Sequence, residues 1–204
     1  MKKIGIINFP SSNVKNLISS LRRNKCDPKL ISNRKELHRV DKLILPGVGS
    51  AKAALDFLNQ KNMKNDLKKI VNNQTPLLGI CLGMQILFKH SDEFNIPCIG
   101  LFNGKVKKLS NQFLSVPNIG WHKIKKQKYK NNKITSIFDN KAKYFYFIHS
   151  YYCLTKYDFD LSFSLDYDYN ILAAFEHKNV FCTQFHPELS GEAGDKIIKN
   201  FIKI

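Results

Sequence analysis

The sequence has no long hydrophobic run. None of its apolar stretches approaches the ~18–20 residues that a membrane-spanning helix needs. The opening Met1-Lys2-Lys3 leads into a short apolar run that stops at Pro10, and no small-residue cleavage site follows, so the pattern does not resemble a secretory signal. We therefore expect a cytoplasmic protein without a membrane partner.

Closely spaced cysteine pairs are also missing. The chain has five cysteines, an odd number, and none forms the CxxC pairs typical of zinc knuckles or redox sites. We expect reduced thiols, no bound metal, and a chemical role for one or two of them at most. The five are Cys26, Cys81, Cys98, Cys153 and Cys182.

Acidic residues are scarce: 16 Asp and Glu stand against 33 Lys and Arg, a net charge of +17. Such an excess fits nucleic-acid binding, because basic side chains release counterions from phosphates. However, the lysines are spread along the whole chain beside many Asn and Ile, as AT-rich coding alone produces. A solvated basic surface without a nucleic-acid partner is the favoured interpretation, and nucleic-acid binding is the alternative.

The 204 residues suit one domain, 1–204, without repeats or a Gly/Ser linker. Short apolar runs alternate with amphipathic segments in the first half, which is the rhythm of βαβ units with a mostly parallel sheet flanked by helices. Beyond about residue 95, closely spaced strand-like runs predict antiparallel additions, and a helix closes the chain. The predicted segments are 4–9, 14–23, 28–31, 42–45, 51–59, 77–80 and 82–90, then 101–109, 121–125, 143–149, 161–165, 171–176, 180–185 and 191–204.

The most informative stretch runs from Thr75 to Gln85 and predicts a strand, a sharp turn and a helix. Gly79 and Gly83 flank Cys81 in a G-x-C-x-G pattern, the thiol form of the nucleophile elbow. Small neighbours let the chain turn tightly, so we expect backbone strain at Cys81. The helix N-terminus would stabilise its thiolate. The alternative is a buried structural cysteine in a glycine-flanked turn.

A second motif, Gln184-Phe185-His186-Pro187-Glu188, follows an apolar strand and so lies at a strand's carboxyl end, where parallel-sheet sites gather. His186 as general base and Glu188 as the group that orients it would complete a nucleophile–base–orienter triad with Cys81. A lone His-Pro-Glu is more often a turn. The two half-motifs together are far more specific.

A third motif, Leu45-Pro46-Gly47-Val48-Gly49, also follows a predicted strand. Its glycines leave the backbone free to point N–H groups at a developing negative oxygen, as an oxyanion hole requires. A simple glycine-rich turn into the next helix is the competing interpretation.

The sequence Gly-Ile-Cys-Leu-Gly-Met-Gln with the later Gln-Phe-His-Pro-Glu resembles the class I (triad) glutamine amidotransferases, which have a flavodoxin-like α/β fold. Two further stretches, Pro117-Asn118-Ile119-Gly120-Trp121 and the run from Tyr146 to Tyr152, are similar to signatures of the glutaminase subunits of imidazole glycerol phosphate synthase. The resemblance covers essentially the whole chain.

By this resemblance, Cys81 forms a glutamyl thioester, His186 moves the protons and Glu188 orients His186. The oxyanion site would lie between Gly49 and Leu82, with a Val48 peptide that has to flip. Glutamine would be held by Gln85, Ser150 and Tyr151. No cofactor is implied.

The resemblance also implies a heterodimer with a (β/α)8-barrel cyclase that receives the ammonia. The candidate interface residues are Asn13, Pro117, Asn118, Ile119, Gly120 and Trp121. We interpret 117–121 as an exposed loop that reports the partner, because Trp is enriched at interface anchors. The alternative is a core Trp at a strand start.

Some residues depart from the family pattern near this interface. Pro10 and Ser12 replace glycines of an early loop, although Ser11 or Ser12 would still be able to N-cap the next helix. His122 and Leu189 also differ from residues common in relatives. We expect intact chemistry and altered docking.

Three rival functions stay open at this stage. The first is a glutaminase of the same family that feeds another acceptor, such as a sugar amidotransferase. The second is a non-catalytic nucleic-acid-binding protein on the same fold, which predicts a broken triad. The third is a cysteine hydrolase or chaperone with the same elbow, which the quoted motifs disfavour only through the resemblance.

Overall fold

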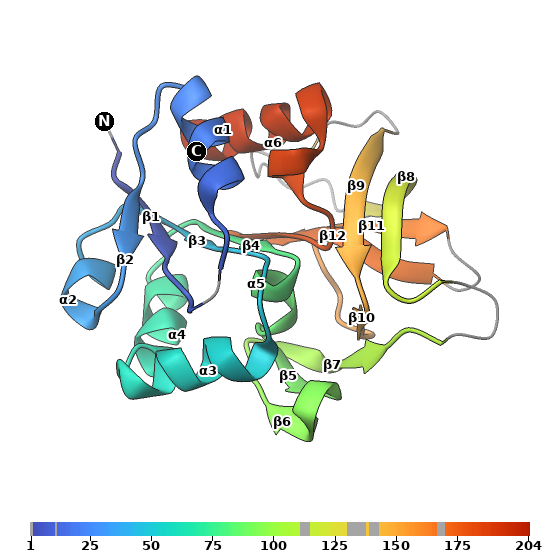
Figure 1. The fold of residues 1–204 in the computed structure, drawn as a ribbon, viewed down its shortest axis with the longest axis horizontal. Coiled ribbons are helices and arrows are strands. Elements are labelled where there is room, and N and C mark those ends of the chain that lie inside the picture. The colour runs from blue at the N-terminus through green and yellow to red at the C-terminus, as the bar shows by residue number, and fades with distance from the viewer. Residues whose placement is uncertain (1, 11, 111–114, 130–137, 139–142, 167–169) are drawn as a thin grey trace.

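The computed structural model describes all residues except 1, 11, 111–114, 130–137, 139–142 and 167–169 (Figure 1). Its helices are α1 (Lys15–Arg23), α2 (Arg34–Leu37), α3 (Ala51–Gln60), α4 (Lys64–Asn72), α5 (Leu82–Gln85) and α6 (Gly191–Lys203), with the 3-10 turns η1 (Glu93–Asn95) and η2 (Pro187–Leu189). Its strands are β1 (Ile4–Ile7), β2 (Lys29–Ile31), β3 (Lys42–Leu45), β4 (Leu77–Ile80), β5 (Phe88–Ser91), β6 (Ile96–Pro97), β7 (Phe102–Lys108), β8 (Asn118–Tyr129), β9 (Tyr144–His149), β10 (Tyr151–Leu154), β11 (Leu161–Asp166), β12 (Asn170–His177) and β13 (Val180–Thr183).

A nine-stranded sheet runs through the molecule in the order β2-β1-β3-β4-β13-β12-β11-β8-β9. The first five strands are parallel neighbours, and from β13 onward every pairing is antiparallel. A second, four-stranded sheet has the order β10-β7-β5-β6. The predicted fold, a mostly parallel sheet with antiparallel additions, is therefore confirmed.

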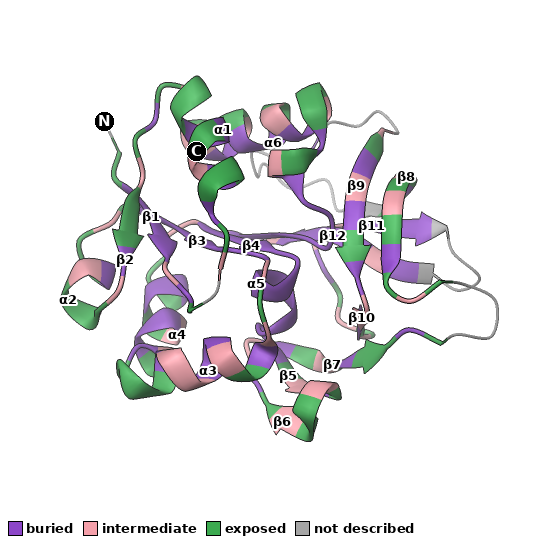
Figure 2. Cartoon of the chain, in the orientation of Figure 1, coloured by how far each residue is buried: buried purple, intermediate pink, exposed green. Residues whose placement is uncertain are grey.

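Helices cover both faces of the parallel half (Figure 1). Side chains of β1 and β3 alternate between two hydrophobic clusters, as the two-residue repeat of a strand requires. Ile6 and Ile44 pack in the cluster that contains residues of α1 and α6. Ile7 and Leu43 pack in the cluster that contains residues of α3 and α4. The central strands are consequently buried on both sides, while the outer faces of the helices are exposed (Figure 2).

The predicted helix over 82–90 is the main error in the fold prediction. The helix ends at Gln85, and the chain then enters strand β5 at Phe88. Ile86, Leu87 and Phe88 are each fully buried, so this stretch has no polar face with which a surface helix would meet water. Phe88 instead packs on Phe102 and Phe175.

The sequence analysis missed two helices, α2 with four residues and α4 with nine. Across the described ranges, no helix is long and apolar enough to pass through a bilayer.

Candidate active site

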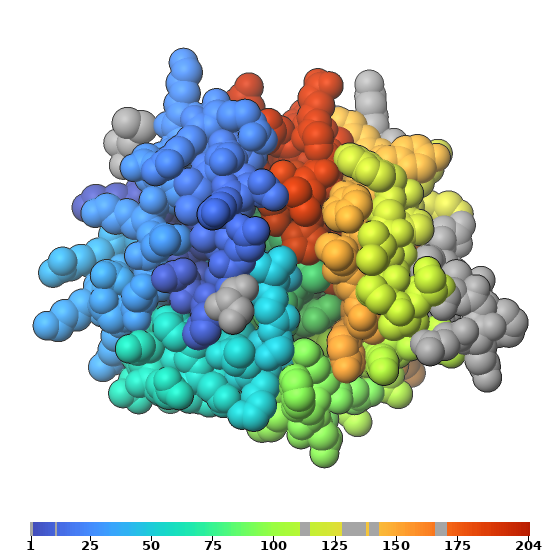
Figure 3. Space-filling model, in the orientation of Figure 1, coloured from blue at the N-terminus to red at the C-terminus, as the bar shows by residue number. Residues whose placement is uncertain are grey.

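A cavity of about 360 Å³ opens where β3, β4 and β9 end. In the space-filling view it is the hollow between the cyan segment that follows β3 and the orange strand β9 (Figure 3). The predicted triad, oxyanion and substrate residues converge here from distant parts of the sequence. The lining residues are Gly47, Val48, Gly49, Cys81, Leu82, Gln85, Glu93, Pro117, Ile148, His149, Ser150, Tyr151 and His186.

Cys81 occupies the turn between β4 and α5. Its φ of 45° and ψ of −104° lie where a side chain is strained, which confirms the strain expected at an elbow. Its N–H donates to Thr183 O at 2.7 Å, which ties the turn to the end of β13. Gly83 permits the sharp turn, because a Cβ there would lie 2.1 Å from Leu45 O. The elbow therefore rests on close backbone packing between α5 and the end of β3.

The other four cysteines have different surroundings. All five are free thiols, as predicted. Burial raises the pKa of Cys98 to about 11 and raises that of Cys153 and Cys182 well above the ordinary range. These three thiols stay protonated and structural at neutral pH, and Cys81 is the one that lines the cavity.

His186 follows β13 and is 1% exposed. Its Nδ1 lies 2.8 Å from Glu188 Oε1. Within the described structure Nε2 is buried and makes no hydrogen bond, which leaves it free to act toward Cys81. Burial opposes protonation of the ring, but the Cys81 sulfur and the Glu188 carboxylate outweigh it and raise the pKa of His186 to about 10.

Gly47 brings the nucleophile and the base together. A Cβ at this position would lie 2.9 Å from His186 Cε1 and 3.0 Å from Cys81 Cβ. Both side chains thus pack directly on the bare glycine. The arrangement can hold a thiolate beside an imidazolium, with Glu188 fixing the ring so that Nδ1–H points at the carboxylate.

The predicted oxyanion residues lie on the cavity wall, but one donor is engaged. Leu82 N–H donates to Gly47 O at 3.4 Å, a long and weak hydrogen bond. In this conformation the Gly47 carbonyl occupies the direction in which a substrate oxygen would accept from Leu82.

The predicted glutamine-binding residues form a hydrogen-bonded wall. Gln85 is 6% exposed, and its Nε2 donates to Tyr151 O at 2.8 Å and to Gln184 Oε1 at 3.1 Å. Tyr151 O also accepts from His149 Nδ1–H at 2.9 Å. His149 therefore has a structural hydrogen-bonding role, and burial lowers its pKa to about 4.

Sequence reasoning missed two residues of the site. Glu93, in η1, lines the cavity, and its Oε2 accepts from Ala51 N–H at 3.0 Å. It was missed because it lies in an irregular segment where we predicted no element. Gln184 Nε2 donates to Cys81 Sγ at 3.4 Å. Its position within the His-Pro-Glu motif was the available signal.

The segment 117–121 is not a loop, and its residues alternate between exposed and buried positions. Strand β8 begins at Asn118, and Ile119 and Trp121 on it are 54% and 53% exposed. The prediction of an exposed Trp is confirmed, and the core alternative is wrong. Asn118 is buried, Gly120 is half-buried, and Pro117 lines the cavity.

Asn13 is exposed and lies outside the cavity wall. Its Oδ1 accepts from Lys15 N–H at 3.2 Å. The N-cap of α1 is Val14, so Ser12 is not the cap; its hydroxyl donates to Phe9 O instead. Ser11 lies outside the described residues.

No group of three or more His, Cys, Asp or Glu side chains that could hold a metal occurs in the described parts of the chain.

Comparison with known proteins shows matches over the full length. Residues 5–204 match the family described as "Glutamine amidotransferase class-I". Curated relatives named "Imidazole glycerol phosphate synthase subunit HisH" include one from Leptospira interrogans, 36% identical over 98% of this chain and all of the relative. One from Bacteroides fragilis is 34% identical over 99% of this chain and all of the relative.

Solved structures share the fold. "Structure of PurLQS from Thermotoga maritima" superposes with a TM-score of 0.75 at 20% identity, covering all of this chain and 99% of the other. "Crystal structure of glutamine amidotransferase" gives 0.73 at 16% identity, covering 98% and 97%.

Proposed function

Because this chain belongs to the class I glutamine amidotransferases and, within them, to the HisH family, we propose that it is the glutaminase subunit of an imidazole glycerol phosphate synthase. It hydrolyses glutamine to glutamate and passes the ammonia to a cyclase subunit of the histidine pathway. The observation that carries this proposal is the cavity that Cys81 and His186 both line, with Glu188 Oε1 2.8 Å from Nδ1 of the His186 ring.

The hydrolysis proceeds in two halves. The Cys81 thiolate attacks the side-chain amide carbon of glutamine, and His186 Nε2–H gives its proton to the departing nitrogen, so that ammonia leaves and a glutamyl thioester forms. The now neutral His186 takes a proton from water, which attacks the thioester carbonyl. The C–S bond breaks, glutamate leaves, and the thiolate and imidazolium are restored. The raised pKa of His186, about 10, favours the protonated ring with which the first half begins.

The cavity wall supplies partners for the rest of the glutamine molecule. Glu93 places a carboxylate on the wall, and it pairs with the α-ammonium group of the substrate. Gln85, Ser150 and Tyr151 line the same cavity and offer amide, hydroxyl and backbone groups to the polar end of glutamine.

The oxyanion site needs a rearrangement before it can work. Leu82 N–H is engaged by Gly47 O at 3.4 Å. A flip of the peptides between Gly47 and Gly49 would withdraw this carbonyl and turn the Val48–Gly49 amide toward the substrate oxygen. Each such donor is commonly worth ~100–1,000-fold in rate. A partner that stabilises the flipped state would therefore activate the glutaminase.

The exposed apolar residues beside the cavity are the proposed docking surface for a (β/α)8-barrel cyclase. Ile119 pairs with Ile148 and Trp121 with Tyr146 across β8 and β9, and Ile148 also lines the cavity. A partner seated here would cover the cavity mouth. A covered cavity excludes water, so the ammonia released there is not protonated. It stays reactive, because ammonia is a nucleophile and ammonium is not.

The test measures glutamate release from the purified chain with glutamine, with and without the cyclase of the same organism and its ribulosyl substrate. We expect release mainly when partner and acceptor are both present, and none with Cys81→Ala. A cyclase that neither binds nor stimulates the chain would refute the histidine assignment and direct the search to another ammonia acceptor.

The docking surface is tested separately with Trp121→Ala. We expect the dissociation constant for the cyclase to rise at least ~30-fold, because buried Trp anchors commonly contribute more than 2 kcal/mol. The matched control is Leu30→Ala on β2, at the opposite edge of the sheet, where an apolar side chain is 42% exposed. Equal effects of both variants would exclude a specific docking role for Trp121.

A further inference from the structure

Gln184 lies fully buried between the substrate wall and the nucleophile. Its Nε2 is 3.4 Å from Cys81 Sγ, within hydrogen-bond reach for a sulfur acceptor, and its Oε1 accepts from Gln85 Nε2 at 3.1 Å. The triad chemistry described above does not use this side chain. We propose that Gln184 donates a hydrogen bond to the Cys81 thiolate and holds the nucleophile in its attacking position, an inference that rests on the proposed glutaminase function.

The surrounding hydrogen bonds fix which end of the Gln184 amide faces the sulfur. Tyr151 O is a carbonyl and only accepts, so Gln85 has to direct its Nε2 toward it, at 2.8 Å. The same Gln85 nitrogen reaches Gln184 and therefore meets its oxygen. Gln184 therefore directs its N–H groups toward Cys81. An N–H donor stabilises a thiolate, whereas the amide oxygen of Gln184 in the same place would repel it.

The hydrogen bonds that orient Gln85 and Gln184 continue through Tyr151 and His149 to Asn118 of β8. His149 Nδ1–H donates to Tyr151 O at 2.9 Å, and the Nε2 of the same ring lies 3.1 Å from Asn118 Nδ2, which donates to it. With a pKa lowered to about 4, His149 stays neutral and keeps this single tautomer at neutral pH. A buried chain of defined donors thus connects Asn118 with the nucleophile.

The second polar contact of the Cys81 sulfur, with Ile148 O, also favours Gln184 as the donor to the thiolate. Cys81 Sγ lies 3.8 Å from Ile148 O, a carbonyl to which only a protonated thiol can donate. Once the proton has left, that contact becomes repulsive, while the Gln184 contact becomes charge-assisted and stronger. The donor from Gln184 therefore favours the reactive ionisation state in a low-dielectric site.

Other titratable groups act on the Cys81 sulfur and have to be held constant in a test. His186, with Glu188 behind it, acts from the end of β13, and Cys153 acts from β10. Glu93 lines the same cavity. None of them is altered by a substitution at Gln184, so a change in the titration of Cys81 reports the lost donor.

The experiment follows alkylation of Cys81 by iodoacetamide across pH in the full free chain, with mass spectrometry of the Cys81 peptide. Gln184→Met keeps the length and removes the donor. We expect the alkylation midpoint to rise by about one pH unit, and glutamate release with the cyclase to fall about tenfold, since one pKa unit is a tenfold change in the thiolate population. Gln184→Leu also removes the donor without adding a charge, and it should shift the midpoint in the same direction.

Thr183→Val is the matched control. Thr183 is the neighbouring residue, fully buried, and its hydroxyl has no partner in the described structure. It should leave the midpoint unchanged. If Gln184→Met does not fold, the alkylation midpoint of Gln184→Leu decides. A midpoint equal to that of the wild type in the folded Gln184 variants, with an active wild type, would overturn the role of Gln184 alone. A wild-type chain that releases no glutamate with the cyclase would instead overturn the proposed function.

Discussion

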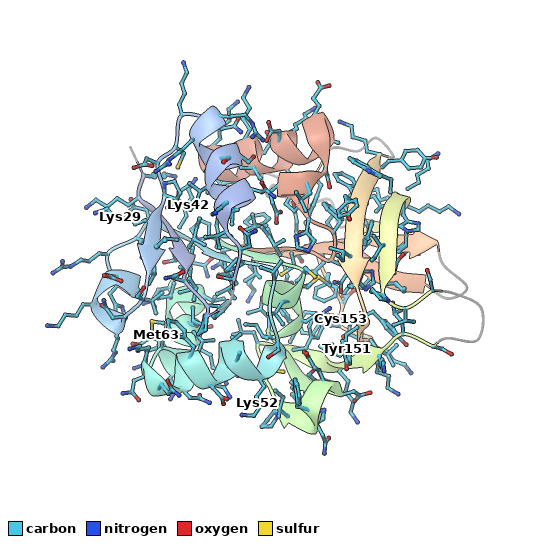
Figure 4. The ribbon with its side chains drawn as sticks, in the orientation of Figure 1. Lys29, Lys42, Lys52, Met63, Tyr151 and Cys153 are labelled. Carbon is cyan, nitrogen blue, oxygen red and sulfur yellow. The ribbon has the colours of Figure 1, made fainter. Side chains whose placement is uncertain are left out.

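The two edges of the parallel sheet each bury a basic side chain, with opposite results. At the amino edge, Lys42 is fully buried at the start of β3, and burial together with the charge of Lys2 lowers its pKa to about 8. At the carboxyl edge, His186 is equally buried, yet its pKa is raised to about 10. Lys42 and Tyr151, a residue of the carboxyl-edge cavity, lie far apart in Figure 4.

The difference lies in what each base meets. Lys42 Nζ donates to Phe201 O at 2.8 Å and Ile202 O at 2.5 Å, two carbonyls at the end of α6, which are dipoles without full charge. His186 meets the Cys81 sulfur and the Glu188 carboxylate. The two carbonyl dipoles do not fully offset the desolvation of the Lys42 ammonium, whereas the two charges outweigh the desolvation of the His186 ring. The amino edge thus anchors a helix, and the carboxyl edge holds the charged pair that the proposed chemistry would use.

The largest effect is expected from His186→Gln, which removes the proton carrier at the carboxyl edge. Glutamate release with the cyclase should fall by ~10²–10⁴-fold, the usual contribution of general acid–base catalysis. The pH midpoint of Cys81 alkylation should also rise, because the imidazolium that stabilises the thiolate is gone. His38→Gln on the C-cap of α2 is the control and should change neither quantity. Unchanged alkylation in His186→Gln would disprove the charged pair.

Glu188→Gln weakens the same pair without removing the base. The amide oxygen still accepts from Nδ1–H, but the negative charge is lost, so the pKa of His186 should fall from about 10. In the proposed mechanism His186 must be protonated to release ammonia, so the alkaline decline in activity should then begin at lower pH. A fall of ~1–2 pKa units still leaves the ring protonated at neutral pH, so the loss of rate should be small there and should grow to roughly tenfold between about pH 9 and 10. If activity declined at the same alkaline pH as in the wild type, Glu188 would not set the pKa that governs this decline.

The carboxyl edge was far more predictable from sequence than the amino edge. Cys81, His186 and Glu188 stand in motifs in which glycine or proline restricts the backbone, and a reaction allows few alternatives at such positions. Glu93 and Gln184 were not identified, because their roles depend on contacts with residues distant in sequence, Ala51 and Cys81.

The local sequence pattern did not predict which residues would be buried by distant segments of the chain. Lys42 appears in the sequence as an ordinary first residue of a strand, and only the return of α6 over β3 encloses it. The predicted helix over 82–90 failed for a similar reason: the apolar residues after Gln85 are buried against strands that follow later in the chain. In both segments, tertiary packing overrides the secondary structure that the local sequence favours.

At the amino edge, Lys42→Met should affect stability and leave chemistry alone. It removes the donor to two carbonyls at the end of α6, and the free energy of unfolding should fall by ~1–3 kcal/mol, the cost of leaving buried acceptors unsatisfied. Urea unfolding measures this change. Glutamate release per folded molecule should match the wild type, with Lys29→Met on the exposed β2 as the control for lost surface charge. Loss of activity at equal folded fraction would contradict the separation of the two edges.

Lys42 should also make the stability of the protein depend on pH. Its pKa is about 8 in the folded chain and 10.5 ordinarily. Below pH 8 both states hold the proton, and the difference in stability between wild type and Lys42→Met should be constant. Between pH 8 and 10.5 the unfolded chain holds a proton that the folded chain has lost, so the stability contributed by Lys42 should rise with pH. Urea unfolding of both proteins from pH 7 to 10.5 measures it, and a difference that narrows as pH rises would show that protonated Lys42 is favoured by the fold after all.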